Sequence, residues 1–352
     1  MQKKIRLVVA DDSPSVLKVL TDGISSDPQI EIVGVARDGI ETIDLVRKLK
    51  PDVITLDVEM PHMDGIEALE RIMEEQPTPV VMVSSLTGKG TATTIRALEL
   101  GAVDFVLKTA SRGGTAVRAL IDELLQKIHT AASANVTGLG KSKKATDEHT
   151  QVSDQQPGPS QVRVVMIACS TGGPQALRMI IPALPGDLQA SVLVVQHLPA
   201  GFTARLAESL NDASPLTVEE AKPSVQLEAG KVLVAPGGVH MRVSSAGRIR
   251  LSLEDRECGV RPSANPIMES LAQVYGASTL GVVLTGMGSD GTRGSGLIKA
   301  AGGSIVAEDE STCVVYGMPK SVATAGYVDK VVPLPRMASE IAKRCQAQER
   351  AA

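Results

Sequence analysis

The stretch VVMIACSTGGPQA at residues 164–176 ends an apolar run with two hydroxyl residues and two glycines, and a predicted helix follows. Glycines let the backbone approach a ligand closely, and N–H groups at a helix start face negative charge. The arrangement suits either a bound phosphate or a nucleophilic serine with its oxyanion. A phosphate loop of the Walker type requires a lysine before its hydroxyl residue, and this stretch has none. We therefore favour Ser170 as a nucleophile, which requires a base.

His197 is the candidate base, because it follows the apolar run SVLVVQ at 191–196. Parallel strands end at the same edge of a sheet, so His197 is expected at the same edge as Ser170. An imidazole with a pKa near 6.5 can accept a hydroxyl proton at neutral pH. Asp290 is the only carboxylate of the loop GMGSDGTRG and would orient the imidazole. The predicted oxyanion donors are the backbone N–H groups of Thr171 and Met287. The other histidine of this region, His240, begins a predicted hairpin, and its placement is less certain.

Cys169 is a rival nucleophile, since it precedes Ser170 directly. Side chains alternate between the two faces of a strand, so Cys169 is expected to turn away from Ser170 and into the packing. The sequence therefore favours the serine.

A nucleotide site is a second alternative. Gly286, Gly288 and Gly291 match the G-x-G-x-x-G spacing of dinucleotide-binding loops, and Glu308 follows at a suitable distance. However, Asp290 would face the pyrophosphate, where like charges repel. A non-enzymatic regulator that binds a nucleotide or a protein partner remains the alternative to an enzyme.

A second group of reactive residues lies near the N-terminus. Asp11 and Asp12 follow the first apolar run, and Asp57 ends the third. Three carboxylates at one sheet edge repel one another unless a cation lies among them, and Mg²⁺ prefers such oxygen ligands. Ser84 and Lys108 end the next two runs and add a hydroxyl and a positive charge. This combination predicts a carboxylate that accepts a phosphoryl group.

The elements that position these residues fall into two α/β units. Residues 5–128 alternate five short apolar runs with five helical patterns, which predicts a parallel sheet covered on both faces. The alternation stops in 131–161, where large apolar side chains are few, and this composition predicts a flexible linker. It resumes from 162, with a hairpin expected at 240–253. The predicted domains are residues 4–130, a linker at 131–161, and residues 162–348.

The bulk composition narrows the class of protein. The 352 residues are 43% hydrophobic and carry a net charge of −4, without an apolar run of the ~18 residues that a membrane helix needs. Four cysteines without paired spacing indicate neither disulfides nor zinc, so a reducing cytoplasm is expected. Without a basic excess, without Trp, and with two Phe and three Tyr, the chain is not expected to bind nucleic acid. Direct membrane insertion is not expected either.

Residues 5–128 resemble a response-regulator receiver domain, a flavodoxin-like (βα)5 fold. The resemblance implies that Asp57 is the phosphoacceptor and that Asp11 and Asp12 hold Mg²⁺ with it. It also implies that Ser84 and Lys108 act as switch residue and phosphate contact, and that a chemotaxis histidine kinase donates the phosphoryl group. One departure is Thr109 after Lys108, where the family usually has proline.

Four motifs of the second unit resemble the chemotaxis-type protein-glutamate methylesterases: STGG at 170–173, QHLP at 196–199, APGG at 235–238 and TGMGSDG at 285–291. Their order Ser, His, Asp differs from that of the α/β-hydrolases. The resemblance implies a doubly wound, mainly parallel catalytic domain. It also implies hydrolysis of glutamate methyl esters on methylated chemoreceptors, with deamidation of certain glutamines and no cofactor for this step. We expect the unphosphorylated receiver to obstruct access to Ser170 until Asp57 is phosphorylated.

Overall fold

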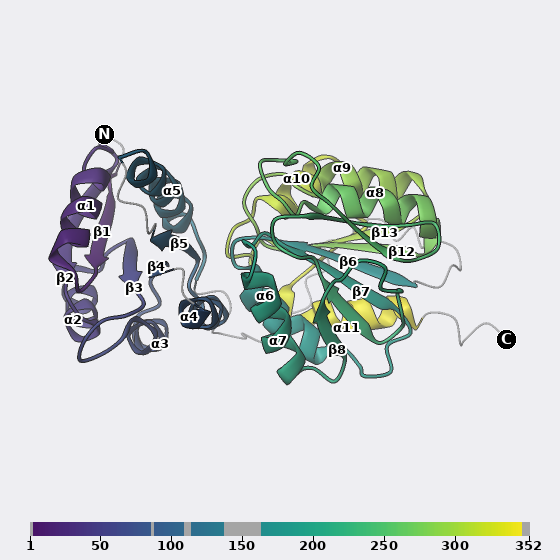
Figure 1. Ribbon diagram of the computed structural model, residues 1–352, viewed down its shortest axis with the longest axis horizontal. Coiled ribbons are helices and arrows are strands. Elements are labelled where there is room, and N and C mark those ends of the chain that lie inside the picture. Colours follow the sequence, from purple (N-terminus) through teal and green to yellow (C-terminus); the bar gives the residue numbers. More distant parts are fainter. Residues whose placement is uncertain (1–2, 86–87, 109–113, 137–162, 347–352) are drawn as a thin grey trace. The chain divides into compact units, whose positions relative to one another are not determined.

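The computed structural model describes residues 3–85, 88–108, 114–136 and 163–346. Contacts divide the chain into two compact units, Met1–Thr137 and Gly138–Ala352 (Figure 1). Each unit is an α/β fold with its own sheet, and each is described by itself below.

The first unit contains a five-stranded parallel sheet with strand order β2-β1-β3-β4-β5. The strands are β1 (Ile5–Ala10), β2 (Ile30–Ala36), β3 (Val53–Asp57), β4 (Val80–Ser85) and β5 (Asp104–Lys108). The helices are α1 (Pro14–Ile24), α2 (Gly39–Leu49), α3 (Gly65–Glu75), α4 (Gly88–Glu99) and α5 (Gly114–Ala132). This is the predicted (βα)5 arrangement.

Local chemistry accounts for where these helices begin. Pro14 occupies the first turn of α1, where its missing N–H has no intrahelical partner to lose. The side chain of Asp64 accepts hydrogen bonds from the N–H groups of Ile66 and Glu67 at the start of α3. Every residue of β3 is buried, as expected for a central strand packed on both faces.

The second unit contains a seven-stranded sheet, and every strand pair in it is parallel. The strand order is β14-β13-β12-β6-β7-β9-β8. The strands are β6 (Val164–Cys169), β7 (Ser191–Gln196), β8 (Thr217–Glu220), β9 (Lys231–Val234), β12 (Thr279–Val283), β13 (Ser304–Glu308) and β14 (Lys330–Val332). The predicted hairpin is the antiparallel pair β10 (His240–Val243) and β11 (Ile249–Ser252).

Helices cover both faces of this sheet. One face packs against α8 (Ala264–Tyr275), α9 (Thr292–Ala300) and α10 (Met318–Thr324). The other packs against α6 (Gly173–Ile180), α7 (Phe202–Ala213) and α11 (Leu334–Cys345) (Figure 1). From β6 the chain builds outwards to β7, and only later returns to the other side of β6 with β12. Ligand sites of doubly wound sheets lie at the carboxyl ends of the strands at such a reversal, which here is the end of β6.

Two details differ from the prediction. The linker does not begin at residue 131, because α5 continues to Ala132 and the side chain of Ala131 is buried. The edge strands β8 and β14 were not predicted, since TVEE and KVV carry too few apolar residues to stand out. The remainder of the predicted linker, 137–162, lies outside the described residues. Among the described helices, none combines the length and apolar character needed to cross a membrane.

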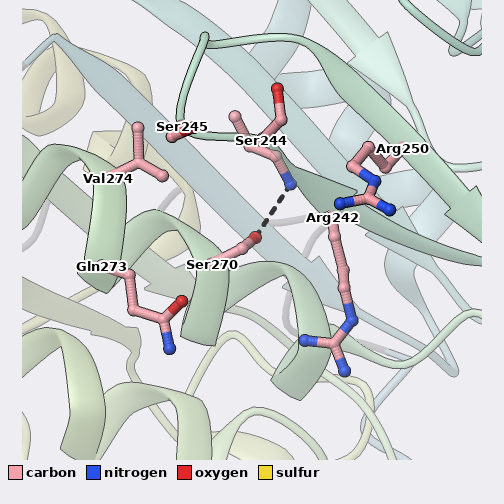
Figure 2. A pocket seen from close by; sticks show the side chains of 8 residues that line it. Arg242, Ser244, Ser245, Arg250, Ser270, Gln273 and Val274 are labelled. Carbon is pink, nitrogen blue, oxygen red and sulfur yellow. Dashed lines mark hydrogen bonds between the residues drawn. The ribbon is translucent and has the colours of Figure 1, made fainter.

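A polar hollow of about 480 Å³ lies between the hairpin and α8 (Figure 2). Its Arg242 is already neutralised by Glu254 at 3.0 Å and Glu269 at 3.1 Å. Its rim is fixed by the N–H of Val243, which donates to Ser270 Oγ. The hollow contains none of the residues predicted to do chemistry.

Candidate active site and phosphoacceptor site

Strand register places Ser170 and His197 next to each other. The last paired residues of β6 and β7 are Cys169 and Gln196, so Ser170 and His197 are the next residue on each strand. The His197 N–H donates to the Cys169 carbonyl at 3.3 Å. On the other side of β6, the Ser170 N–H donates to the Thr285 carbonyl at 3.0 Å. Ser170 therefore lies between the ends of β7 and β12, at the chain reversal.

Asp290 is hydrogen-bonded to His197, with 2.8 Å between Asp290 Oδ2 and His197 Nε2. The two side chains are only 2% and 9% exposed. Burial opposes ionisation of Asp290, but hydrogen bonds from His197, Ser263 Oγ (2.6 Å) and Ala264 N (2.7 Å) outweigh it and lower the pKa of the carboxyl. An ionised Asp290 holds Nε2 as the protonated nitrogen, which leaves Nδ1 as the acceptor of the ring.

His240 does not join this group. Its side chain is buried, its Nε2 lies 2.9 Å from the Asp255 carbonyl, and its Nδ1 lies 3.2 Å from the Ser263 N–H. The Nδ1 must accept that hydrogen bond, so both ring nitrogens are used within the fold. His240 orders Ser263, which in turn donates to Asp290.

The peptide between Ser170 and Thr171 has a fixed orientation. The Ser170 carbonyl accepts from the Gly173 N–H at 2.8 Å and from Gln196 Nε2 at 2.9 Å. In a planar trans peptide the N–H points opposite to the carbonyl, so the Thr171 N–H points away from these donors. This fixed orientation is compatible with the oxyanion role predicted for the Thr171 N–H.

The peptide before Met287 is held in the same way. The Gly286 carbonyl accepts from the N–H groups of Gly317 at 3.1 Å and Met318 at 2.8 Å, which turns the Met287 N–H in the opposite direction. A Cβ on Gly286 would lie 2.8 Å from the Ser170 Cβ, so only glycine lets this loop pack against Ser170. The two peptides predicted to donate to the oxyanion, those before Thr171 and before Met287, therefore both adjoin Ser170.

Of the two glycines noted in the sequence, Gly172 is required for close packing as well as for the turn. Gly172 has φ +79°, a left-handed conformation that favours glycine, and a Cβ there would lie 2.6 Å from the Val314 Cβ. Because Gly172 packs closely against Val314, the chain can turn directly from Ser170 into α6.

Neither of the two alternatives, a cysteine nucleophile or a nucleotide site, fits the geometry of this sheet edge. The Cys169 side chain is fully buried, with its Sγ 3.7 Å from the Val195 carbonyl, and burial raises the pKa of the thiol. Glu308, the acid of the dinucleotide-like pattern, is also fully buried, and its Oε2 accepts from the Thr285 N–H at 2.8 Å. It therefore faces the protein interior and not a bound ribose.

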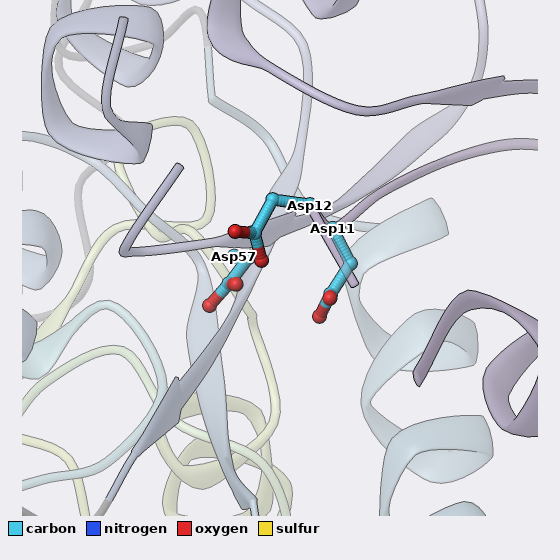
Figure 3. A group of neighbouring side chains, drawn as sticks. All are labelled: Asp11, Asp12 and Asp57. Atoms are coloured by element: carbon cyan, nitrogen blue, oxygen red, sulfur yellow. The ribbon is translucent and has the colours of Figure 1, made fainter. Parts of the chain in front are cut away.

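In the first unit, Asp11, Asp12 and Asp57 come together as predicted (Figure 3). One carboxylate oxygen of each lies within 4.8 Å of the others. Lys108 Nζ lies 2.8 Å from Asp11 Oδ2 and 2.7 Å from Asp57 Oδ2. Burial raises the pKa of Asp57 to about 6 despite the lysine. Three clustered carboxylates, two of them buried and sharing one ammonium group, suit a divalent cation with oxygen ligands.

Ser84 lies one strand away from Asp57, since Asp57 pairs with Val83 across β3 and β4. Its buried hydroxyl accepts a hydrogen bond from Thr94 Oγ1 at 2.7 Å. Thr109, the departure from the receiver pattern, lies outside the described residues.

Comparison with known proteins assigns a family to each unit. Residues 165–341 match the CheB methylesterase family, and residues 7–128 match the response regulator receiver domain. The chain is 45% identical to a protein-glutamate methylesterase/protein-glutamine glutaminase of Pyrococcus horikoshii, over 97% of this chain and 94% of that protein. It is also 45% identical to the protein of the same name from Symbiobacterium thermophilum, over 97% and 98%. The chain belongs to the CheB methylesterase family.

Structural comparison supports this assignment. The CheB methylesterase catalytic domain of Thermotoga maritima covers 53% of this chain and 99% of that structure, with 42% identity and a TM-score of 0.51. The predictions of an enzyme, of methylesterase and glutaminase activity, and of a receiver domain in front are confirmed. The non-enzymatic alternative is not supported.

Sequence reasoning missed several residues that hold this CheB-family site in place. Gln196 and Thr285 lie inside the quoted motifs QHLP and TGMGSDG, but nothing in their residue types reveals whose backbone they bind. Ser263 precedes α8 as a typical N-cap residue, and this signal was available. Its second role, donating to Asp290, arises only because the start of α8 lies beside the end of β12.

Proposed function

We propose that this CheB-family enzyme hydrolyses γ-glutamyl methyl esters of chemoreceptors with Ser170 as nucleophile, His197 as base and Asp290 as orienting acid. His197 Nδ1 takes the proton from Ser170 Oγ, which attacks the ester carbonyl carbon. The imidazolium returns that proton to the methoxy oxygen, and methanol departs. The glutamyl acyl group stays bound to Ser170 Oγ as an acyl-enzyme. Water activated by the same nitrogen then releases the glutamate. The 2.8 Å bond between His197 and Asp290, at the strand ends that carry Ser170, is the observation that supports this proposal.

The oxyanion formed in each step would be held by the Thr171 and Met287 N–H groups. Their peptides are fixed through the opposite carbonyls, so the donors need no reorganisation during the reaction. Losing one such donor typically costs about 3 kcal/mol of transition-state stabilisation. With a glutamine side chain, the same steps release ammonia in place of methanol.

Labelling with a fluorophosphonate tests the assignment of the nucleophile. The reagent forms a stable ester with an activated serine, so peptide mass spectrometry of the full chain should place the modification on Ser170. Methanol release from methylated receptor membranes should stop in proportion to labelling. Modification of Cys169 with loss of activity, or full activity after Ser170 is labelled, would contradict the proposal.

We further propose that Asp57 accepts a phosphoryl group from a chemotaxis histidine kinase and thereby controls the esterase. Asp11, Asp12 and Asp57 would hold Mg²⁺, whose charge offsets that of the incoming phosphoryl group. Lys108, already 2.7 Å from Asp57 Oδ2, would pair with the added phosphoryl oxygens, and the Ser84 hydroxyl would turn towards them. The added charge would end the obstruction of Ser170 by the receiver. The cytoplasmic location expected from the cysteines stays a prediction.

Replacing Asp57 with Asn should abolish stimulation by a small-molecule phosphodonor such as acetyl phosphate, because an amide cannot form the acyl phosphate. Methanol release from methylated receptor membranes measures the effect, and basal release should persist. Asp44→Asn is the matched control, since Asp44 is exposed on α2 and has no role at the site. Equal stimulation of the Asp57 variant and wild type would refute phosphoryl control at this residue. If residues 160–352 alone are no faster than the unphosphorylated chain, obstruction is the wrong mechanism.

Replacing Gln196 with Leu should lower kcat about 10- to 100-fold with little change in KM. The substitution removes the side-chain donor that fixes the Ser170 carbonyl, so the Thr171 N–H loses its orientation towards the developing oxyanion. Gln189→Leu is the control, because Gln189 is exposed and bonds only to the nearby Asp187 carbonyl. A raised KM with unchanged kcat would instead indicate a contact with the bound substrate.

A further inference from the structure

Glu308 is a buried carboxyl group that the reaction scheme above does not use. It ends β13, and its side chain is fully buried. Oε2 accepts from the Thr285 N–H at 2.8 Å, and Oε1 lies 3.0 Å from Thr312 Oγ1. Within the described part of the chain, no lysine, arginine or histidine forms an ion pair with it. A buried carboxyl without a cation is costly to keep, so its position needs an explanation.

Thr285 links this carboxyl to the nucleophile. Its carbonyl accepts the Ser170 N–H at 3.0 Å, and its Oγ1 donates to the Thr171 carbonyl at 2.9 Å. The same Oγ1 accepts from the Val315 N–H at 2.9 Å. Glu308 therefore binds Thr285, which in turn binds the Ser170 N–H and the carbonyl of Thr171.

We propose that Glu308 is a positioning residue of the active site, which fixes Thr285 behind Ser170 and whose charge limits activity at alkaline pH. The inference rests on the proposed role of Ser170 as nucleophile. It adds a titrating group outside the proposed triad to the activity profile.

The hydrogen bonds around Glu308 suit both of its protonation states. When the carboxyl is ionised, Thr312 Oγ1 donates to Oε1. When it is neutral, Oε1–H can donate to Thr312 Oγ1, whose own proton then turns to the Asp309 carbonyl at 3.2 Å. Oε2 can accept from Thr285 in both states. Ionisation thus adds a charge without breaking the link to Ser170.

The environment of Glu308 brings its pKa close to neutral pH. Burial raises the pKa of Glu308 to about 7, although the hydrogen bonds from Thr285 and Thr312 oppose the rise. The titratable groups that face it are the Cys169 thiol from β6 and the Cys313 thiol and Asp309 carboxylate from the following loop. The thiol pKa values are raised and Asp309 is an acid, so none of these groups supplies a positive charge at neutral pH.

The position of the charge gives the direction of the effect. Glu308, Thr285, Ser170 and His197 follow each other across the ends of β13, β12, β6 and β7. The oxyanion donors follow β6 and β12, whereas the imidazolium forms one strand further away. An ionised Glu308 therefore opposes the oxyanion more strongly than it favours the imidazolium. The rate should therefore fall as Glu308 ionises.

The test is the pH dependence of methanol release from methylated receptor membranes by the full chain, between pH 5.5 and 9. The kcat of wild type should fall above pH 7. Glu308→Gln keeps an acceptor oxygen for Thr285 but cannot ionise, so its kcat should stay level above pH 7 and exceed wild type about three- to tenfold at pH 8.5. Superimposable profiles would overturn the proposed effect of charge.

Positioning is tested by Glu308→Met, which removes the acceptor for the Thr285 N–H. Its kcat should fall about tenfold or more at every pH with KM unchanged, a larger loss than Glu308→Gln shows at pH 6.5. Equal activity of the Met and Gln variants would overturn the positioning role. Glu310→Gln is the control, because Glu310 is an exposed acid two residues away.

Ser170→Ala separates this inference from the proposed function. If that variant retains activity, the nucleophile is misassigned. If it is inactive and Glu308→Gln has the wild-type profile, only the inference about Glu308 fails. Thermal unfolding of each variant distinguishes a kinetic effect from loss of folded protein.

Discussion

Ser170→Ala should lower kcat for methanol release from methylated receptor membranes by about 10⁴- to 10⁶-fold. Alanine removes the oxygen that we propose attacks the ester, while the proposed oxyanion donors remain. The residual rate should therefore stay above that of free water, and KM should change little. Folding should not suffer, because the structural bonds of this residue run through its backbone N–H and carbonyl.

Cys169→Ala provides the comparison for this prediction. Cys169 adjoins Ser170 in sequence but packs beneath the sheet edge with a fully buried side chain. The substitution removes one buried sulfur, so it should lower the free energy of unfolding more than it lowers kcat. The kcat should stay within about tenfold of that of wild type. The reverse outcome, an active Ser170 variant and an inactive Cys169 variant, would transfer the nucleophile to the cysteine.

Asp290→Asn should lower kcat by about 10³- to 10⁴-fold. All the bonds of Asp290 are to donors, and an amide replaces one of its two acceptor oxygens by a donating NH₂ group. An NH₂ facing His197 would force the ring to accept at Nε2 and carry its proton on Nδ1. Nδ1, which we propose takes the Ser170 proton, would then be unable to accept it.

The same substitution should reduce stability by about 1 kcal/mol, because the carboxylate also accepts the Ala264 N–H at the start of α8. The pKa of Asp290 is lowered, so its contribution is present above the ordinary value of 3.8 and lost as pH falls through the lower folded value. Thermal unfolding at pH 7 therefore measures the ionised state. Asp255→Asn is the control, since Asp255 is exposed and engages His240 only through its carbonyl. A kcat unchanged by Asp290→Asn would exclude Asp290 as the orienting acid.

Much of the fold could be read from the sequence because the central strands are apolar throughout. β6 and β7 have every residue buried, and runs such as SVLVVQ are therefore unambiguous. The edge strands were missed for the opposite reason, since Val218 is the only buried residue of β8. The end of α5 was predicted too early because AASA at 131–134 has only small side chains. This segment also carries no residue that marks the end of a helix.

The candidate site residues could also be predicted from the sequence. Ser170, His197, Asp11 and Asp57 each sit at or just after the end of an apolar strand, and parallel strands bring such ends to one edge. Spacing along the chain was enough to propose that they meet. It was not enough to establish which histidine joins the site, because His197 and His240 both follow apolar segments.

By itself, the sequence determined the two α/β units and the chemical types gathered at each sheet edge, because these depend on local periodicity and strand ends. Only the tertiary structure decided which polar groups bind each other across the edge. The Ser170 peptide is held by Gln196, Asp290 by the start of α8, and Thr285 by Glu308. These contacts join residues far apart in the chain, and no local pattern encodes the direction in which a side chain or a peptide points.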